Sequence, residues 1–124
     1  MFSILSSGDL SFHINKDDEP YFEKLKCFEY EKLELEVNGD ININIAFTDK
    51  RILFFEKKDK ETAMLTLPYH SINRWSATIN DVPTMINTTT LSITIYTERN
   101  TYEFLTIDKT LVEQINNCLM KHVL

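Results

Sequence analysis

The sequence predicts an α+β domain in which a strongly bent antiparallel sheet is covered by one C-terminal helix. Short segments that alternate apolar and polar residues recur from Glu29 to Leu105. The period of the apolar residues then lengthens to that of a helix between Asp108 and Val123. A series of strands followed by one terminal helix is typical of α+β proteins, in which the helix covers an open end or one face of the sheet.

The clearest local feature is a hairpin that runs from Glu29 to Phe47. Its first half alternates apolar residues with glutamates, the pattern of a strand with one face in the core and one in water. An Asn-Gly-Asp turn follows at 38–40, where Asn and Gly accept the positive φ of tight hairpins. The second half alternates isoleucines with asparagines, so we expect two antiparallel strands here.

Two more strands follow this hairpin. Residues 48–51 form a polar turn, because Thr and Asp side chains bond to the nearby backbone. Residues 52–55 are all apolar, which indicates a central strand rather than an edge. A charged turn at 57–61 leads to a strand at 63–67, and Pro68 must lie at a strand end because it has no N–H.

The last strands surround a long irregular segment. A strand from Arg74 to Ile79 carries Trp75, and the loop at 81–90 is long for a hairpin. Two strands joined by a turn at 98–100 follow, Leu91 to Tyr96 and Tyr102 to Leu105.

The C-terminal helix has one apolar face and defined ends. Asp108 or Thr106 supplies the N-cap oxygen, and Lys121 lies near the C-terminus, where the helix dipole favours a cation. The face consists of Leu111, Val112, Ile115, Cys118, Leu119 and His122 or Val123.

The domain boundaries follow from these elements. We expect a single domain over 1–124, with the sheet at 29–105 and the helix at 107–123. Residues 1–28 form an N-terminal extension of uncertain structure, with one or two short strands in 1–20 and a helix in 21–28.

Composition excludes several classes of protein. The chain of 124 residues has a net charge of −6, which argues against binding to DNA or RNA. Residues 1–5 lack the basic region and the length of apolar run expected of a signal peptide, and no run of about 20 apolar residues occurs, so we expect a cytoplasmic protein. Cys27 and Cys118 lie far apart and are expected to be reduced, buried thiols rather than a disulfide or a metal site.

No set of residues with catalytic, cofactor-binding or metal-binding spacing is found in the sequence. The histidines His13, His70 and His122 lack such spacing, and His70 is expected to be a partly buried strand-end residue. Two glycines in the whole chain exclude a Gly-rich phosphate loop. The glutamates at 29, 31, 34 and 36 could form an acid–base pair, but a solvated strand face is the favoured interpretation. We therefore expect a protein that is not an enzyme and needs no cofactor or metal.

Two motifs resemble those of the bacterial pleckstrin-homology (PH) domain family. A strand ends in Phe47-Thr48-Asp49-Lys50-Arg51, and Pro68-Tyr69-His70-Ser71-Ile72 follows the next hairpin. The likeness runs from about Ile41 to the closing Lys121-His122-Val123-Leu124. It implies a PH-like fold, with a partly open barrel of about seven strands and a C-terminal helix. It also implies a module that oligomerises, since bacterial relatives resemble ring-forming scaffolds.

Two functions from different classes remain open. The first is a protein-interaction module that assembles with copies of itself through an open sheet edge, for which the Ser- and Thr-rich strand 91–96 is suited. Its candidate interface residues are Leu91, Ile93, Ile95 and Trp75. The second is binding to an anionic lipid headgroup through the basic turns, with Lys50, Arg51, Lys57, Lys58 and Lys60 as candidate residues. Acidic neighbours dilute both basic turns, so the first function is favoured.

Overall fold

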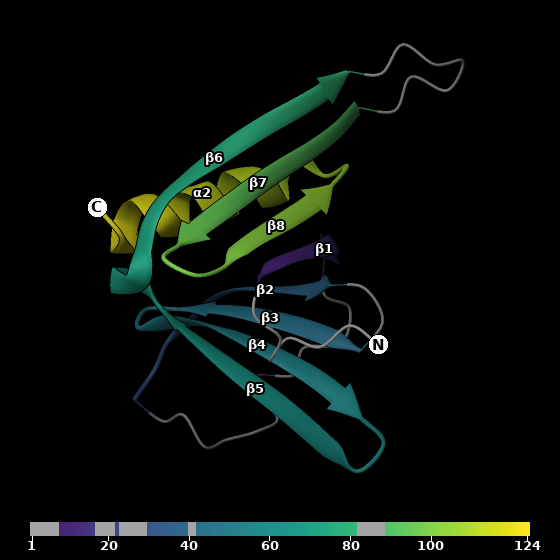
Figure 1. The fold of residues 1–124 in the computed structure, drawn as a ribbon, viewed down its shortest axis with the longest axis vertical. Coiled ribbons are helices and arrows are strands. Elements are labelled where there is room, and N and C mark those ends of the chain that lie inside the picture. The colour runs from purple at the N-terminus through teal and green to yellow at the C-terminus, as the bar shows by residue number, and fades with distance from the viewer. Residues whose placement is uncertain (1–7, 17–21, 23–29, 40–41, 82–88) are drawn as a thin grey trace.

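A computed structural model describes residues 8–16, 22, 30–39, 42–81 and 89–124. These residues form one eight-stranded sheet, a short 3-10 helix and a C-terminal α-helix (Figure 1). The elements are β1 (Asp9–Lys16), β2 (Leu33–Gly39), β3 (Ile43–Thr48), β4 (Arg51–Lys58), β5 (Glu61–Pro68), η1 (Tyr69–Ser71), β6 (Ile72–Asp81), β7 (Thr89–Thr97), β8 (Thr101–Thr106) and α2 (Lys109–His122). The predicted helix at 21–28 lies outside the described residues, apart from Phe22.

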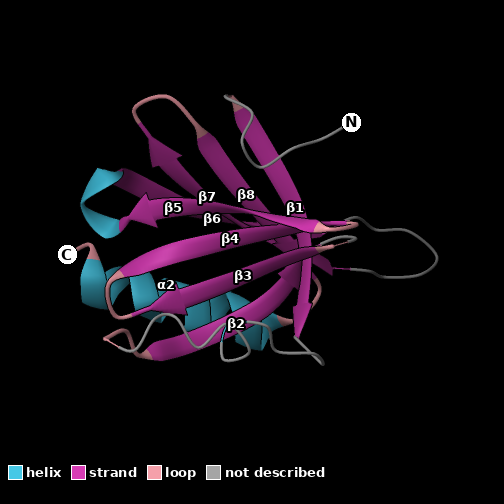
Figure 2. Cartoon of the chain, turned by 90° about the horizontal axis from the view of Figure 1, so that it is seen from below, coloured by secondary structure: helices cyan, strands magenta, loops and turns pink. Residues whose placement is uncertain are grey.

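The sheet is curled rather than closed. Its strand order is β5-β4-β3-β2-β1-β8-β7-β6, so β5 and β6 are its two edges although η1 alone separates them in the chain. The strands curl strongly while the two edges diverge, which gives an open half-barrel (Figures 1 and 2). The predicted α+β class is confirmed, with eight described strands where the sequence indicated about seven.

The additional strand, β1, joins the two halves of the sheet. It runs antiparallel to β2, where Ile14 lies opposite Gly39, and parallel to β8, where Phe12 lies opposite Phe104. Alternate residues Leu10, Phe12 and Ile14 are buried, as expected for a strand with one face in the core. The sequence indicated short strands in 1–20 but did not place them in the sheet.

Aromatic rings fill the concave side of the sheet. The ring of Phe12 lies 5.5 Å from that of Phe54 and 5.8 Å from that of Phe104, so β1, β4 and β8 meet there. Phe54 also stacks on Tyr102, at 5.2 Å between ring centroids. Contacts in this range stabilise a core beyond the burial of apolar area alone.

Strand β4 is buried on both faces, as the uninterrupted run at 52–55 predicted. Strand β3 is also buried on both faces, so the half-buried strand that its alternating isoleucines and asparagines predicted was wrong. On the face away from the aromatic core, Ala46, Leu53 and Phe55 form a second apolar cluster. Phe22 packs on this cluster, and its N–H donates to Glu36 at 2.9 Å. Phe22 therefore covers this part of the outer face of the sheet.

Helix α2 packs across β7, β8 and β2 with its predicted apolar face. Leu111, Ile115 and Leu119 are buried there. Asp108 is the N-cap, and its carboxylate accepts a hydrogen bond from the Thr110 N–H at 2.9 Å.

The role predicted for Gly39 was wrong. Gly39 is the last residue of β2, and Asn42 instead has the positive φ, 68°. A Cβ at Gly39 would lie 3.2 Å from Ile45 Cδ1 and 3.4 Å from Phe12 Cβ. A side chain at Gly39 would crowd side chains of the two strands that flank β2, Phe12 of β1 and Ile45 of β3, so glycine relieves close packing here and does not supply a positive φ.

Candidate functional site

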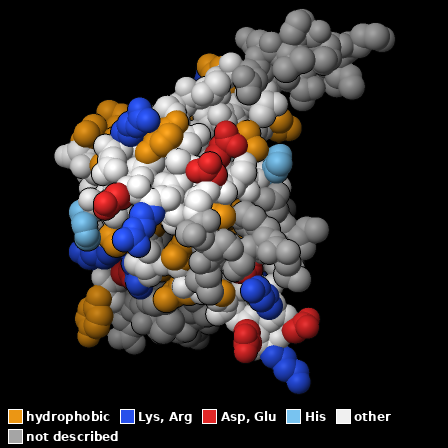
Figure 3. All heavy atoms as spheres, viewed as in Figure 1, with side chains coloured by type: hydrophobic (Ala, Val, Ile, Leu, Met, Phe, Trp, Pro, Cys, Tyr) orange, Lys and Arg blue, Asp and Glu red, His pale blue; other side chains and the backbone are white. Residues whose placement is uncertain are grey.

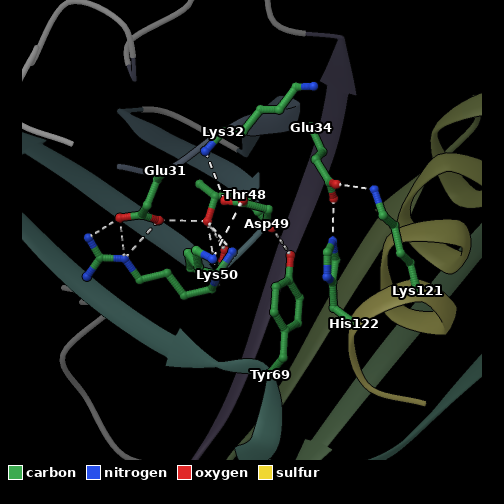
Figure 4. Close-up of polar contacts among 10 residues, drawn as sticks. Glu31, Lys32, Glu34, Thr48, Asp49, Lys50, Tyr69, Lys121 and His122 are labelled. Carbon is green, nitrogen blue, oxygen red and sulfur yellow. Dashed lines mark hydrogen bonds and ion pairs between the residues drawn. The ribbon is translucent and has the colours of Figure 1, made fainter. Parts of the chain in front are cut away.

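The two sequence motifs contact each other (Figure 4). The Thr48 hydroxyl oxygen accepts hydrogen bonds from the backbone N–H groups of Lys50 at 3.1 Å and Arg51 at 3.0 Å, which fixes the β3–β4 turn. The Tyr69 hydroxyl, from η1, donates to the Thr48 carbonyl at 2.7 Å. The motif residues thus bind the end of β5 to the turn between β3 and β4.

Arg51 is held by a carboxylate that precedes β2. Its Nη2 lies 2.6 Å from Glu31 Oε1, and its Nε donates to the same oxygen at 2.9 Å. The Glu31 Oε2 also accepts from the Thr48 hydroxyl at 2.7 Å. Only 24% of the Arg51 side chain and 11% of that of Glu31 are exposed. Such two-point pairs between guanidinium and carboxylate are geometrically specific.

A second carboxylate ties α2 to β2. Glu34 accepts from Lys121 Nζ at 2.6 Å, and its other oxygen lies 2.5 Å from His122 Nε2 (Figure 4). The His122 ring stacks on Tyr69, with 4.7 Å between centroids. The C-terminal motif residues Lys121 and His122 therefore complete the same cluster as Thr48 and Tyr69.

The pKa shifts of these side chains indicate that the cluster has a structural role. Burial acts to raise the pKa of Glu34, but the hydrogen bonds and charges of Lys121 and His122 outweigh it and lower that pKa. Burial raises the pKa of Tyr69 far above its ordinary value, and it raises the pKa of Cys118 to about 11. Tyr69 and Cys118 are thus protonated at neutral pH and are not activated nucleophiles.

The prediction of a solvated acidic face on the first hairpin was wrong for Glu31 and Glu34. Each carboxylate is largely buried against a basic partner, Arg51 for the first, Lys121 and His122 for the second. Sequence periodicity gave no signal of this, because the partners lie up to 88 residues away. His70, expected to be partly buried, is exposed in η1.

The candidate anion-binding residues do not converge. Lys50 and Arg51 lie at the β3–β4 end of β4, whereas Lys57, Lys58 and Lys60 lie at the β4–β5 end. Arg51 is bound to Glu31, and Lys58 Nζ lies 3.3 Å from Glu56. Blue and red side chains are mixed over this face of the molecule, including the projecting β4–β5 turn (Figure 3).

The predicted interface strand is not a sheet edge. Strand β7, which contains Leu91, Ile93 and Ile95, lies between β6 and β8, and both isoleucines are fully buried. The Ser and Thr residues that suggested an edge lie on the outer face of an interior strand. Trp75 lies on β6, where it packs against the core and donates from Nε1 to Asn116 at 2.9 Å.

The outer edge of the sheet is β6 itself. Among the described strands, it pairs with β7 alone, and its register is regular from Arg74 to Asp81 after an irregularity at its start. The residues from Ser76 to Ile79 are exposed, and Ile79 is 66% exposed. Arg74 is the one charged residue from 74 to 79, and its guanidinium lies 4.3 Å from the Tyr96 ring centroid.

The other edge, β5, carries features that limit pairing. It begins at Glu61, next to the charged β4–β5 turn, and it ends at Pro68, which cannot donate a backbone hydrogen bond. Its alternate residues Ala63 and Leu65 pack against the core, while Met64 is 43% exposed on the other face.

The described residues offer few other sites. They contain no group of three or more His, Cys, Asp or Glu side chains placed to hold a metal ion. Within the same residues, no helix is long and apolar enough to cross a membrane.

Comparisons with known proteins agree with this fold. The family model described as "Bacterial PH domain" matches residues 30–121. A protein with a pleckstrin-homology domain from Shewanella loihica has a similar crystal structure, with a TM-score of 0.60 and 17% sequence identity over 90% of this chain and 98% of that one. A pleckstrin-homology domain from Shewanella amazonensis gives a TM-score of 0.54 and 14% identity over 81% of this chain and 90% of that one. No curated protein matches the chain.

Proposed function

Because the chain belongs to the bacterial PH domain family, we propose that it is a non-enzymatic module that acts through protein contacts and assembles with copies of itself in the cytoplasm. The observation that carries this proposal is the open edge at β6. A strand edge presents a row of backbone N–H and C=O groups that can pair with a strand of another molecule.

Three features make β6 suited to such pairing. It is ten residues long, so it can form several backbone hydrogen bonds with a partner strand. From Trp75 to Ile79 it has no charge and no proline, the residues by which natural proteins protect an edge. It also exposes the apolar side chains of Ala77 and Ile79, which lie on the same face of the sheet as Trp75.

The polar cluster supports a role without catalysis. Its carboxylates Glu31 and Glu34 are each paired, and burial keeps Tyr69 protonated. The contacts of these residues join the segment before β2, β2, the β3–β4 turn, η1 and α2 to one another, so they stabilise the fold.

The alternative, binding of an anionic lipid surface, has weaker support. Basic residues lie at two ends of β4, and Arg51 is already held by Glu31. The net charge of −6 also opposes approach to a negative membrane.

The experiment is light scattering coupled to size exclusion over a range of concentrations, with charge placed on each edge in turn. Ala77→Lys puts a cation on the exposed β6 edge, and Met64→Lys makes a matched change on β5. We expect the wild type and Met64→Lys to form a discrete multiple of 14.6 kDa and Ala77→Lys to stay at 14.6 kDa.

Two results would change the proposal. Loss of assembly in both variants would indicate that β5 of one copy pairs with β6 of the next. A monomer for the wild type at every concentration would refute self-assembly. In that case, co-sedimentation with anionic vesicles, weakened by rising salt, would support the lipid alternative.

A further inference from the structure

The outward side of β6 has a pattern of side chains that suits pairing with itself. Its register with β7 is regular from Arg74, opposite Tyr96, onwards. Trp75, Ala77 and Ile79 lie on the core side, and Ser76 and Thr78 lie on the other side. On the core side, the small side chain of Ala77 therefore lies between the larger side chains of Trp75 and Ile79.

We infer that two copies of this chain pair β6 with β6 in antiparallel orientation, about a two-fold axis that passes beside Ala77. The inference rests on the proposed self-assembly and specifies its geometry. Ala77 lies opposite Ala77 of the second copy, and Trp75 lies opposite the second copy's Ile79. On the other side of the sheet, Ser76 lies opposite Thr78 of the second copy.

The alternation of faces restricts the register. In an antiparallel pair, opposite residues lie on the same face, so a shift of one residue would place the apolar row of one copy against the polar row of the other. The registers that keep the faces matched are centred on individual residues such as Ser76, Ala77 or Thr78. A centre at Ser76 places Ile79 opposite Asn73, in the irregular part of the strand. A centre at Thr78 places Trp75 opposite Asp81.

The register centred on Ala77 avoids both mismatches. It covers the exposed Ile79 with the indole of Trp75, and aromatic residues opposite β-branched ones are favourable cross-strand pairs. Two alanines at the centre leave room for these larger neighbours. The two copies of Arg74 lie about 20 Å apart along the strands, so their like charges do not oppose each other.

The two-fold arrangement also explains how the second edge can remain unpaired. An isologous contact uses the same patch on both copies and closes after two. The edge at β5, with Glu61 at one end and Pro68 at the other, then stays at the outside of a combined sheet.

The test is disulfide trapping with single cysteines, in a background where Cys27 is replaced by Ser and Cys118 by Ala. Ala77→Cys places its thiol next to the same cysteine of the second copy, because directly opposite Cα atoms are about 4.5–5.5 Å apart, within the range of a disulfide. We expect mild oxidation to convert Ala77→Cys to a covalent dimer. Ser76→Cys alone and Thr78→Cys alone should cross-link weakly, because the Cα atom of each cysteine lies about 8 Å from that of the same cysteine in the second copy. A mixture of these two variants should cross-link strongly.

The outcomes separate this geometry from the self-assembly on which it rests. A doubled mass in solution with no Ala77→Cys dimer and no cross-link in the mixture would overturn the register and leave self-assembly intact. A mass of 14.6 kDa at every concentration would overturn both. Far-ultraviolet circular dichroism of each variant shows that it has folded, which is expected because residues 76–78 are exposed.

Discussion

At the scale of single residues, the ion pair between Arg51 and Glu31 leads to the most specific prediction about stability. Both side chains are largely buried, and Glu31 accepts hydrogen bonds from Arg51 and from Thr48. Replacing the carboxylate by an amide leaves a mostly buried guanidinium without its counter-charge. We expect Glu31→Gln to lower the free energy of unfolding by about 2 kcal/mol, measured as a shift of the urea midpoint.

The neighbouring Lys50 is the matched control for this change. Its side chain is 64% exposed, and its Nζ lies 3.9 Å from Asp49. Exposed pairs of this kind contribute little, so Lys50→Gln should change the stability by less than about 0.5 kcal/mol. Equal losses in the two variants would show that Arg51 is not held in the way described.

The contact between Glu34 and the end of α2 predicts a dependence of stability on pH. Burial opposes ionisation of Glu34, but Lys121 and His122 outweigh it and hold its pKa below the ordinary value of 4.5. A carboxyl with a lowered pKa stabilises the fold above its unfolded pKa, and this contribution is lost as the pH falls through the folded pKa. Glu34→Gln should therefore be less stable than the wild type at neutral pH, and the difference should shrink below pH 4.5.

Urea titrations of both proteins at a series of pH values measure this difference. Lys121 sets the alkaline limit, because the hydrogen bond to Glu34 raises its pKa above 10.5, and the contribution of Lys121 disappears as the pH rises through that raised value. A difference between the two proteins that stays constant through the acid range would contradict the assignment of Glu34.

At the scale of elements, β1 is a short strand that should contribute strongly to the stability of the fold, because it joins the two halves of the sheet. Phe12 is fully buried and touches rings from both halves of the sheet, Phe54 and Phe104. We expect Phe12→Ala to lower the free energy of unfolding by about 3–5 kcal/mol. This strand belongs to the core of the domain even though the family match begins only at residue 30. The adjacent Ser11→Ala, on the exposed face, should have a small effect. If the two variants were equally stable, β1 would not join the halves as described.

The strands and the terminal helix could be predicted from sequence because their signals are local. Alternation marked β2, β3, β7 and β8, the apolar run at 52–55 marked the buried strand β4, and the change of period marked α2. The chemistry of single residues predicted the strand end at Pro68 and limited the N-cap to Asp108 or Thr106, of which the structure uses Asp108.

The neighbours of each strand could not be predicted in the same way. Strand β7 has the Ser- and Thr-rich face of an edge strand, but β6 and β8 pair with both of its sides. Pairing partners are set by contacts between distant residues, such as β1 with β8, about 92 residues apart in the chain. For the same reason, the burial of Glu31 and Glu34 appeared only when their partners were placed beside them.

At the scale of the whole molecule, the order of the strands decides which strand edges are open, and we propose that a second copy pairs at one of them. A curled sheet that does not close leaves β5 and β6 as edges, and the residues from Trp75 to Ile79 in the middle of β6 carry no charge. Pairing at this edge depends on backbone hydrogen bonds and apolar contacts, which salt screens little. Assembly should therefore persist at high salt.

The most direct measurement is amide hydrogen exchange of the two edge strands at low and high protein concentration. Amides that gain a partner strand become protected from exchange. We expect exchange in β6 to slow as the concentration rises, exchange in β5 to stay the same, and Ala77→Lys to abolish the effect. Exchange in β6 that is independent of concentration, or protection that grows at β5 instead, would contradict the proposal that this protein assembles through β6.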